Sequence, residues 1–308
     1  MKFLYKHPDF LYLVNKTAEK LNLPAIMVEK DYWVTFLLRN LVNSEFNEEI
    51  IFKGGTCLSK AWKLINRFSE DIDILLIETN QTKSKQSKGK RIKEMRDFIN
   101  LSQELKLIDD KHTKLYASLR YSYPIAVSSA FSSSITSNIL LEPGYRGGIK
   151  PEIIKKPINS LLGELLQDSF GEYDVEPFKI NVLTLERIFI EKLFAIKALF
   201  DNGKLKARTR HYYDVYMLAK SDEIMALLSD KAKISLIIDD IAKISSVYFP
   251  DEEIVDFAEL KSCTAFTHEF KGIDEVQQGY INEKDLYFGE RPDFTALITV
   301  INNAIIRS

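Results

Sequence analysis

The sequence predicts an α+β protein, in which a small mixed-sheet core carries helical segments on both sides. Apolar residues recur at helical spacing over the first 45 residues, and short apolar runs typical of strands follow in the middle of the chain. Helical spacing then returns from Thr184 onward. With 308 residues, the chain is long enough for one large domain or two ordinary ones.

The N-terminal segment, residues 1–45, is expected to be helical throughout. One helix is predicted over residues 9–23, because its periodic pattern stops at Pro24. A second helix is predicted over residues 24–42, where apolar side chains keep helical spacing. These are Ile26, Trp33, Leu37 and Leu41.

The middle of the chain reads as strand, glycine turn, helix and strand. The apolar run before Gly54 and Gly55 predicts the first strand, and the run that begins at Asp71 predicts the second. The polar, lysine-rich residues 79–93 are expected to form a surface loop that leads into a helix over 91–107.

Two more strands are predicted, over residues 114–125 and 137–145, with a serine-rich turn between them. Glycine and proline residues near 150 and an acidic segment near 175 mark a domain boundary. The expected organisation is a helical segment over 1–45, a core over 46–165 and a helical domain over 166–308. That last domain is expected to complete the active site.

Composition limits the class of protein. The chain has 42 basic and 44 acidic side chains, so attraction to nucleic acid would have to come from a local patch. Two cysteines, Cys57 and Cys263, are too few for a disulfide framework or a multi-cysteine zinc site. The N-terminus has no signal-peptide pattern and no run is long enough for a membrane span. We therefore expect a soluble, cytoplasmic protein with no membrane partner.

Two motifs in the core carry chemistry. Gly54, Gly55 and Thr56 stand between a predicted strand and a predicted helix, where backbone N–H groups can bind an anion. Asp71 and Asp73 are two residues apart on the next strand, so their carboxylates share one face and suit Mg²⁺. Either motif alone is also compatible with an ordinary turn or a solvated strand end.

A third constellation lies more than a hundred residues further on. Lys192 sits within an apolar helical segment, where its amine either reaches solvent or faces a counter-charge. Arg208 and Arg210 precede His211 and Asp214, which are three residues apart and share a helical face. A structural hydrogen-bonded pair would explain His211 and Asp214 equally well.

Taken together, the glycine turn and the D-x-D strand resemble the signature of the polymerase-β-like nucleotidyltransferase superfamily. The longer string FKGGTCLSKAWKLINRFSEDIDI, residues 52–74, resembles the motif of the AbiEii/AbiGii family of nucleotidyltransferase toxins. These toxins occur in bacterial toxin–antitoxin and phage-defence pairs. The segment around Lys192 and Asp214 is similar to the C-terminal motifs of the same family, although this chain has Arg210-His211 where many relatives have Arg-Asp.

The resemblance implies roles for individual residues. Asp71 and Asp73 would bind Mg²⁺ and be catalytic, with Glu142 as the candidate for a third metal-binding carboxylate. Lys192 and Asp214 would be required parts of the catalytic site, with Asp214 orienting Lys192 or a neighbouring arginine. The residues expected to bind the nucleotide are Gly54, Gly55, Thr56, Ser69, Lys60 and Arg67.

The activity implied is transfer of a nucleoside monophosphate from an NTP to an RNA acceptor, with the tRNA 3′ end as the expected acceptor. The basic residues of 83–93 are candidates to guide that RNA, and a cognate antitoxin protein is an expected partner. Two alternatives stay open: a non-catalytic nucleotide-binding regulatory module, and a nucleotidyltransferase that acts on a small molecule.

Overall fold

The computed structural model describes residues 2–127, 135–248 and 257–307. Its contacts divide the chain into two compact units. The first, which we call the sheet unit, comprises Met1–Lys63, Phe68–Tyr145 and Lys155–Val182. The second, the helical unit, comprises Leu64–Arg67, Arg146–Ile154 and Leu183–Ser308.

This division differs from the one expected from the sequence. Residues 1–45 belong to the sheet unit. The long continuous segment of the helical unit begins at Leu183 rather than at residue 166. The short segment Leu64–Arg67 belongs to the helical unit although it lies between the glycine turn and the D-x-D strand in sequence.

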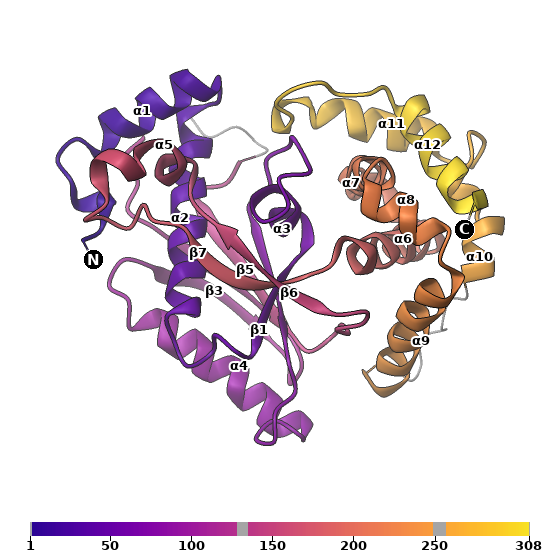
Figure 1. The fold of residues 1–308 in the computed structure, drawn as a ribbon, viewed down its shortest axis with the longest axis horizontal. Coiled ribbons are helices and arrows are strands. Elements are labelled where there is room, and N and C mark those ends of the chain that lie inside the picture. The colour runs from indigo at the N-terminus through magenta and orange to yellow at the C-terminus, as the bar shows by residue number, and fades with distance from the viewer. Residues whose placement is uncertain (1, 128–134, 249–256, 308) are drawn as a thin grey trace. The chain divides into compact units, whose positions relative to one another are not determined.

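A seven-stranded mixed sheet is the centre of the sheet unit (Figure 1). Its strand order is β3-β4-β5-β2-β1-β7-β6. The strands are β1 (Ile50–Lys53), β2 (Asp71–Leu76), β3 (Lys106–His112), β4 (Ala117–Ser122), β5 (Asn138–Gly144), β6 (Ile153–Ile158) and β7 (Phe178–Leu183).

Strand β2 lies in the interior of this sheet, between β1 and β5. It pairs antiparallel with β1 and parallel with β5, so Asp73 stands beside Lys53 on one side and Glu142 on the other. Strand β1 also pairs parallel with β7. Burial alternates along β5 and at the start of β2, as expected where one face packs on the core.

Helix α2 is the central helix of the sheet unit and is buried around most of its circumference. It packs against α1 and α5, as Figure 1 also shows, and Trp33 and Phe36 form an aromatic cluster with Tyr5. The helices of this unit are α1 (Phe10–Leu21), α2 (Ala25–Val42), α3 (Gly54–Lys60), α4 (Lys85–Asn100) and α5 (Leu161–Phe170).

Charged side chains on α2 are buried with their partners. Glu29 accepts hydrogen bonds from the backbone N–H groups of Ala126 and Val127 at 2.5 and 3.3 Å. Arg39 donates to the backbone carbonyls of Asp174 and Glu176 at 3.1 and 2.6 Å. These bonds offset the desolvation that buried charge would otherwise incur, and they fix the connecting segments to the helix.

The helical unit is built on α6 and α7, which pack against each other, and α12 packs on α7. Its core includes Tyr212 on α7, whose ring lies edge-on to Phe294 on α12 with centroids 5.1 Å apart. The helices of this unit are α6 (Leu185–Asp201), α7 (Arg210–Ala219), α8 (Asp222–Leu228), α9 (Lys231–Tyr248), α10 (Phe257–Ser262), α11 (Ile273–Asn282) and α12 (Phe294–Arg307).

Several expectations from the sequence are confirmed. The two N-terminal helices, the strand–turn–helix–strand segment that contains Gly54 and Asp71, and the helical character after Thr184 are all present. The α+β class is confirmed as well. The predicted strands over 114–125 and 137–145 correspond to β4 and β5, while most of the serine-rich turn lies outside the described residues.

The expectation of a loop over residues 79–93 is wrong for most of its length. Helix α4 begins at Lys85, because Ser84 forms a capping box with Ser87 and lysine is a good helix former. Lys88 and Arg91 are buried on the packed side of α4, where they pair with Glu78 and Glu49. The lysine-rich composition therefore marks a half-packed helix.

The helix predicted over 91–107 is also too long. It ends at Asn100, and β3 follows from Lys106 at the edge of the sheet. The sequence KLIDDKH is mostly polar and carries no strand-like apolar alternation, as edge strands often do.

Strands β6 and β7 and helix α5 were not predicted. Strand β6 lies at the other edge of the sheet, which is why it tolerates two lysines and Pro157. The glycine and proline residues near 150 thus lie at the start of a strand, and the acidic segment near 175 leads into β7.

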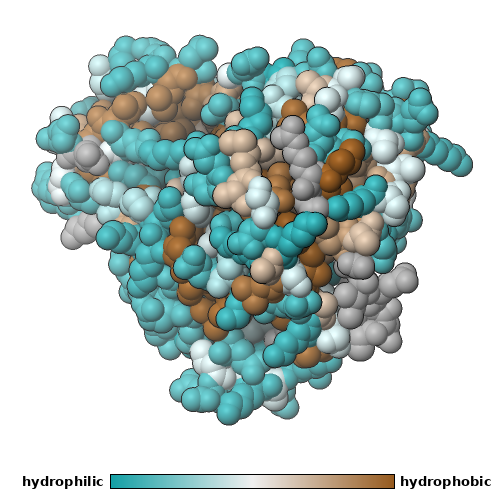
Figure 2. Space-filling view, turned by 45° about the vertical axis from the view of Figure 1, so that its right-hand side comes forward, coloured by the Kyte–Doolittle hydropathy of each residue, from teal (hydrophilic) through white to brown (hydrophobic). Residues whose placement is uncertain are grey.

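On the face drawn in Figure 2, hydrophobic residues form separate patches among hydrophilic ones. Within the described residues, no helix is long and apolar enough to cross a membrane.

Replacing Ser84 by alanine should destabilise the protein by about 1 kcal/mol, because it removes the N-cap of α4. Urea unfolding followed by circular dichroism measures this loss. Ser235→Ala, inside α9, is the control and should be neutral or slightly stabilising, because alanine is the better helix former. Equal stability of the Ser84→Ala variant and the wild type would contradict the assigned helix start.

Candidate active site

The predicted carboxylate pair is present at the start of β2. Asp71 and Asp73 are both partly exposed, whereas Ile72 and Ile74 between and after them are buried. The two-residue period of a strand therefore places both carboxylates on the open face of the sheet, as the sequence predicts.

Gly54 and Asp73 lie so close that no side chain fits between them. A Cβ atom on Gly54 would stand 1.9 Å from Oδ2 of Asp73, and Gly54 has a φ of +77°. Both facts require glycine here, since a positive φ is costly for other residues and the contact would be a clash. The backbone of the glycine turn thus directly adjoins a carboxylate of the pair.

Thr56 joins the turn to the start of β2. Its buried hydroxyl lies 2.5 Å from the backbone carbonyl of Asp71 and 3.0 Å from the hydroxyl of Ser69. The first of these is a donated hydrogen bond, because the carbonyl can only accept. Two predicted nucleotide-binding residues are therefore in contact, and the hydroxyl of Thr56 holds the turn and the strand in register.

Lys60 lies at the end of α3 and is almost fully buried. Its ammonium forms an ion pair with Asp31 of α2, and the other carboxylate oxygen of Asp31 accepts the N–H of Leu161 at 2.7 Å. The charge of Lys60 is thus matched within the sheet unit. Its predicted contact with a nucleotide stays a prediction.

Glu142, the candidate for a third metal-binding carboxylate, lies beside Asp73 in register. Its carboxylate accepts a hydrogen bond from the hydroxyl of Tyr116. Across the described residues, no three His, Cys, Asp or Glu side chains are grouped so that they could hold one metal ion. Glu142 thus stands next to Asp73 on the neighbouring strand with its carboxylate bonded to Tyr116, and its role as a third metal ligand stays a prediction.

Asp71 and Asp73 by themselves fit a Mg²⁺ site. This ion is usually bound by one or two carboxylates together with substrate phosphates, so a complete cage of protein ligands is not needed. Asp71 and Asp73 supply two carboxylates on one face, next to a turn that lacks a side chain.

Lys30 and Glu70 are a pair that the sequence analysis did not find. The side chain of Lys30 is completely buried, and its ammonium bonds to the carboxylate of Glu70 and to the carbonyl and hydroxyl of Thr136. Burial lowers the pKa of Lys30, while the charges of Glu70 and Asp71 oppose that effect. The signal in the sequence was the run Glu29-Lys30-Asp31 inside an otherwise apolar helix.

A second cluster lies in the helical unit, around the fully buried carboxylate of Asp214 on α7. Arg67 binds both of its oxygens, with Nε and Nη2 each 2.7 Å away. Nζ of Lys192, on α6, donates to Oδ2 at 2.7 Å. Three residues predicted from separate parts of the sequence are therefore in direct contact.

The electrostatics of this cluster follow from its burial. Desolvation alone would raise the pKa of Asp214, but the charges and hydrogen bonds of Arg67 and Lys192 outweigh it and hold that pKa well below its usual range. Burial opposes the charge of Arg67, yet Asp214 raises the pKa of the guanidinium overall. The cluster contains two cations and one anion and so carries a net positive charge.

Arg67 reaches Asp214 because its short segment is tied into the helical unit. The backbone N–H of Asn66 donates to the hydroxyl of Tyr213 at 3.1 Å, and the N–H of Phe288 donates to the carbonyl of Asn66 at 3.0 Å. Arg67 itself forms an isolated β-bridge with Tyr287. These bonds explain why Leu64–Arg67 belongs to the helical unit, although the residues on either side of it belong to the sheet unit.

His211 lies at the start of α7, beside this cluster. Desolvation and the positive charges of Lys192, Arg67 and Arg208 lower its pKa to about 3, although Asp214 opposes them. Its Nδ1 is buried and has no hydrogen-bond partner among the described residues. The alternative of a hydrogen-bonded His211–Asp214 pair is therefore not observed in the described part of the chain.

Comparison with known proteins places the chain in a family. The family model described as "Nucleotidyl transferase AbiEii toxin, Type IV TA system" matches residues 35–293. This chain belongs to the AbiEii family. It is thus a nucleotidyltransferase toxin of a type IV toxin–antitoxin system, with an NTP as substrate and an antitoxin as partner.

A solved structure shares the fold of this AbiEii protein. It is MenT4, a nucleotidyltransferase toxin from Mycobacterium tuberculosis H37Rv, with a TM-score of 0.55 and 14% sequence identity. The match covers 96% of this chain and 88% of MenT4. No curated protein matches the chain. The family resemblance and the enzyme class expected from the sequence are both confirmed.

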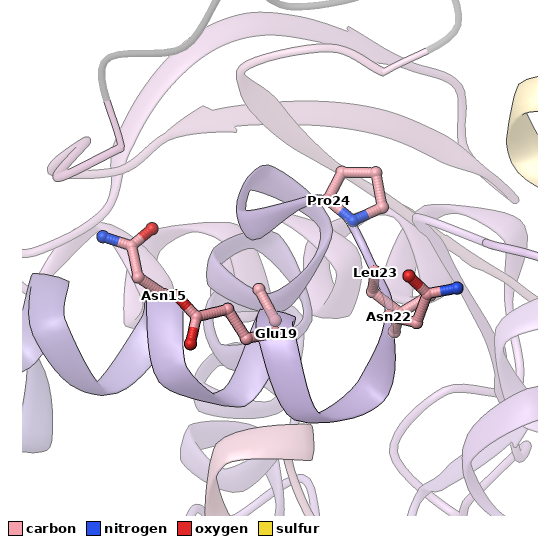
Figure 3. A pocket seen from close by; sticks show the side chains of 6 residues that line it. Asn15, Glu19, Asn22, Leu23 and Pro24 are labelled. Carbon is pink, nitrogen blue, oxygen red and sulfur yellow. The ribbon is translucent and has the colours of Figure 1, made fainter.

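A hollow on the AbiEii protein lies elsewhere, where α1 turns into α2 (Figure 3). Asn22 and Pro24 lie at this turn, and none of the predicted site residues lines it. With Glu19 as its only charged lining residue among those described, it offers no constellation for transfer chemistry.

The substitution Gly54→Ala tests the close approach to Asp73. Gly203 also has a positive φ, +64°, but a Cβ there would meet nothing within 4 Å, so Gly203→Ala measures backbone strain alone, about 1–2 kcal/mol. We expect Gly54→Ala to lower the free energy of unfolding by about 1–3 kcal/mol more than Gly203→Ala does, because the methyl group must displace Asp73. Urea unfolding measures both losses. Equal losses for the two variants would refute the contact.

The pKa of His211 predicts an acid-sensitive fold. Because the folded pKa is about 3 and an unfolded histidine titrates near 6.5, the unfolded state binds the proton first as the pH falls. Stability should therefore be lost progressively below about pH 6.5, by about 2 kcal/mol between pH 7 and pH 5.

Denaturant unfolding at several pH values measures this loss, and His211→Gln should flatten the curve over the same interval. If the wild type and His211→Gln lost stability in parallel between pH 7 and pH 5, the buried neutral state of His211 would be disproved.

Proposed function

We propose that this AbiEii protein transfers a nucleoside monophosphate from an NTP to the 3′ end of an RNA, with tRNA as the acceptor, and releases pyrophosphate. The observation that carries the proposal is the contact between the glycine turn and the carboxylate strand, Gly54 against Asp73, in a member of a nucleotidyltransferase family. Blocking the 3′ end of tRNA would halt translation, which accounts for a toxin.

Mg²⁺ is the metal of the proposal, with Asp71 and Asp73 as its protein ligands. When bound, it supplies neutralisation of phosphate charge and activation of the acceptor hydroxyl. The chain's own contribution is to present two carboxylates at fixed spacing on a buried strand. The buried Lys30 pairs with Glu70, which directly precedes that strand.

The triphosphate would be bound by donors of the glycine turn. The backbone N–H groups of Gly55 and Thr56 are the donors that we assign to it, and the hydroxyl of Ser69, which donates to Thr56 in this structure, would turn toward the triphosphate when it binds. The hydroxyl of Thr56 is not assigned, since it already donates within the protein. Gly54 contributes through the absence of a side chain, which lets the carboxylate of Asp73 lie directly against the turn.

The Arg67–Asp214–Lys192 cluster is proposed to be required for transfer. Asp214 holds both cations in one place, and the side chain of Lys192 is about one-tenth exposed. A cation held in a fixed position stabilises negative charge that develops on phosphates, because the cation does not have to move during the reaction. Asp214 acts through Lys192 and is a positioning residue.

The acceptor and the cellular setting complete the proposal. RNA supplies both the hydroxyl and a phosphate backbone, and the reaction would take place in the cytoplasm, where tRNA and NTPs are available. The antitoxin would counteract the toxin, and loss of that protection during phage infection would make the pair a defence system.

Incubation with each labelled NTP, Mg²⁺ and bacterial tRNA tests the proposal. Asp73→Asn should lower transfer by about a hundredfold or more, because a charge stabiliser of the transfer is lost, and Lys192→Ala should have an effect of similar size. Asp109→Asn, on the edge strand β3, is the matched control and should retain full activity.

Label on tRNA with the wild type and with Asp109→Asn, and its near absence with Asp73→Asn, is the expected result. Bound NTP without transfer to any acceptor would contradict the proposal in favour of a regulatory nucleotide-binding module. Label on a small molecule but on no RNA would contradict the assigned acceptor.

A further inference from the structure

A basic groove lies on the sheet unit, between the first half of α4 and the turn that joins β3 to β4. Three lysines line it, Lys90 and Lys93 from α4 and Lys114 from the turn. The hydroxyl groups of Ser84, Ser87 and Thr113 line it as well. We call this surface the α4 groove.

The lining of the α4 groove is unbalanced in charge. Among the described residues that line it there is no carboxylate, and its three lysines are exposed. Lys90 approaches Glu94 at 3.6 Å, but with four-fifths of its side chain exposed this pair is worth little. His112, also in the lining, bonds to Asp110 at 2.9 Å and so has its own counter-charge.

The backbone fixes the shape of this groove. Gly89 has no side chain where α4 meets the turn, and a Cβ there would lie only 3.1 Å from Cα of Lys114. The capping box between Ser84 and Ser87 fixes the start of α4, and Thr113 pairs with Tyr116 across the turn. The three lysines are therefore carried by segments that are held against one another.

We propose that the α4 groove binds the phosphate backbone of the acceptor RNA; this rests on the proposed function. Three exposed ammonium groups spread along a groove match phosphates repeated along a chain, and hydroxyl donors add hydrogen bonds without base specificity. Because the whole chain carries a net charge of −2, a local surface of this kind is what attracts a polyanion.

RNA binding without any NTP tests the inference apart from catalysis. The probe is fluorescently labelled bacterial tRNA, and its anisotropy gives the Kd over a range of salt concentrations. The variant Lys90→Gln/Lys93→Gln/Lys114→Gln should bind about tenfold more weakly at moderate salt. If the contacted RNA is single-stranded, its log–log salt slope should be shallower by about 2, since three phosphate contacts are lost.

The control removes three exposed lysines elsewhere on the same unit, as Lys16→Gln/Lys20→Gln/Lys179→Gln. It has the same net charge as the groove variant and should bind RNA nearly as well as the wild type. NTP binding should be unchanged in both, because no residue of the proposed transfer site is altered.

Equal weakening by both triple variants would overturn the inference, since binding would then follow net charge alone. Displacement of tRNA by poly-glutamate as readily as by unlabelled tRNA would also overturn it and indicate an acidic protein segment as the ligand. RNA binding that depends on the groove, together with no transfer to any RNA, would support the groove and refute the proposed function.

Discussion

The contact between Gly54 and Asp73 is the constraint around which the proposed site is organised. A glycine with positive φ lets the turn adjoin a carboxylate of the interior strand β2, at a distance that excludes even a methyl group. Thr56 then secures the same turn to the carbonyl of Asp71. The short helix α3 is consequently joined to the carboxylate strand at two points, the close approach of Gly54 to Asp73 and the hydrogen bond of Thr56.

Each unit buries charge around a central helix and compensates it locally. In the sheet unit, α2 carries Glu29, Lys30 and Arg39 into the interior, where backbone groups and Glu70 satisfy them. In the helical unit, the carboxylate of Asp214 forms ion pairs with the buried side chains of Arg67 and Lys192. Such pairs add little net stability compared with apolar packing, but breaking one leaves an uncompensated charge. They therefore specify which segments must meet, including Leu64–Arg67, which crosses to the helical unit.

Sequence reasoning succeeded where one local pattern determined the structure. The two-residue period placed Asp71 and Asp73 on one face, and helical spacing identified α2 and α6. It failed where tertiary context decided: Lys88 and Arg91 find partners that turn a supposed loop into helix α4, and edge strands β3 and β6 lack an apolar pattern. Lys30 could not be paired with Glu70 because 40 residues separate them. The contact of Lys192 with Asp214 was anticipated only through family resemblance.

The Asp214 cluster has an asymmetry that bears on how such a protein can change in evolution. If Lys192 is lost, Asp214 still has both oxygens bound by Arg67, so the buried anion stays compensated. If Asp214 is lost, two buried cations lose the carboxylate that both of them contact. During evolution, a substitution of Lys192 would therefore cost the fold little stability, whereas a substitution of Asp214 would cost it much more. If Lys192 is needed for transfer as proposed, folded but inactive descendants would be recognised by an altered residue 192 beside an intact Arg67 and Asp214.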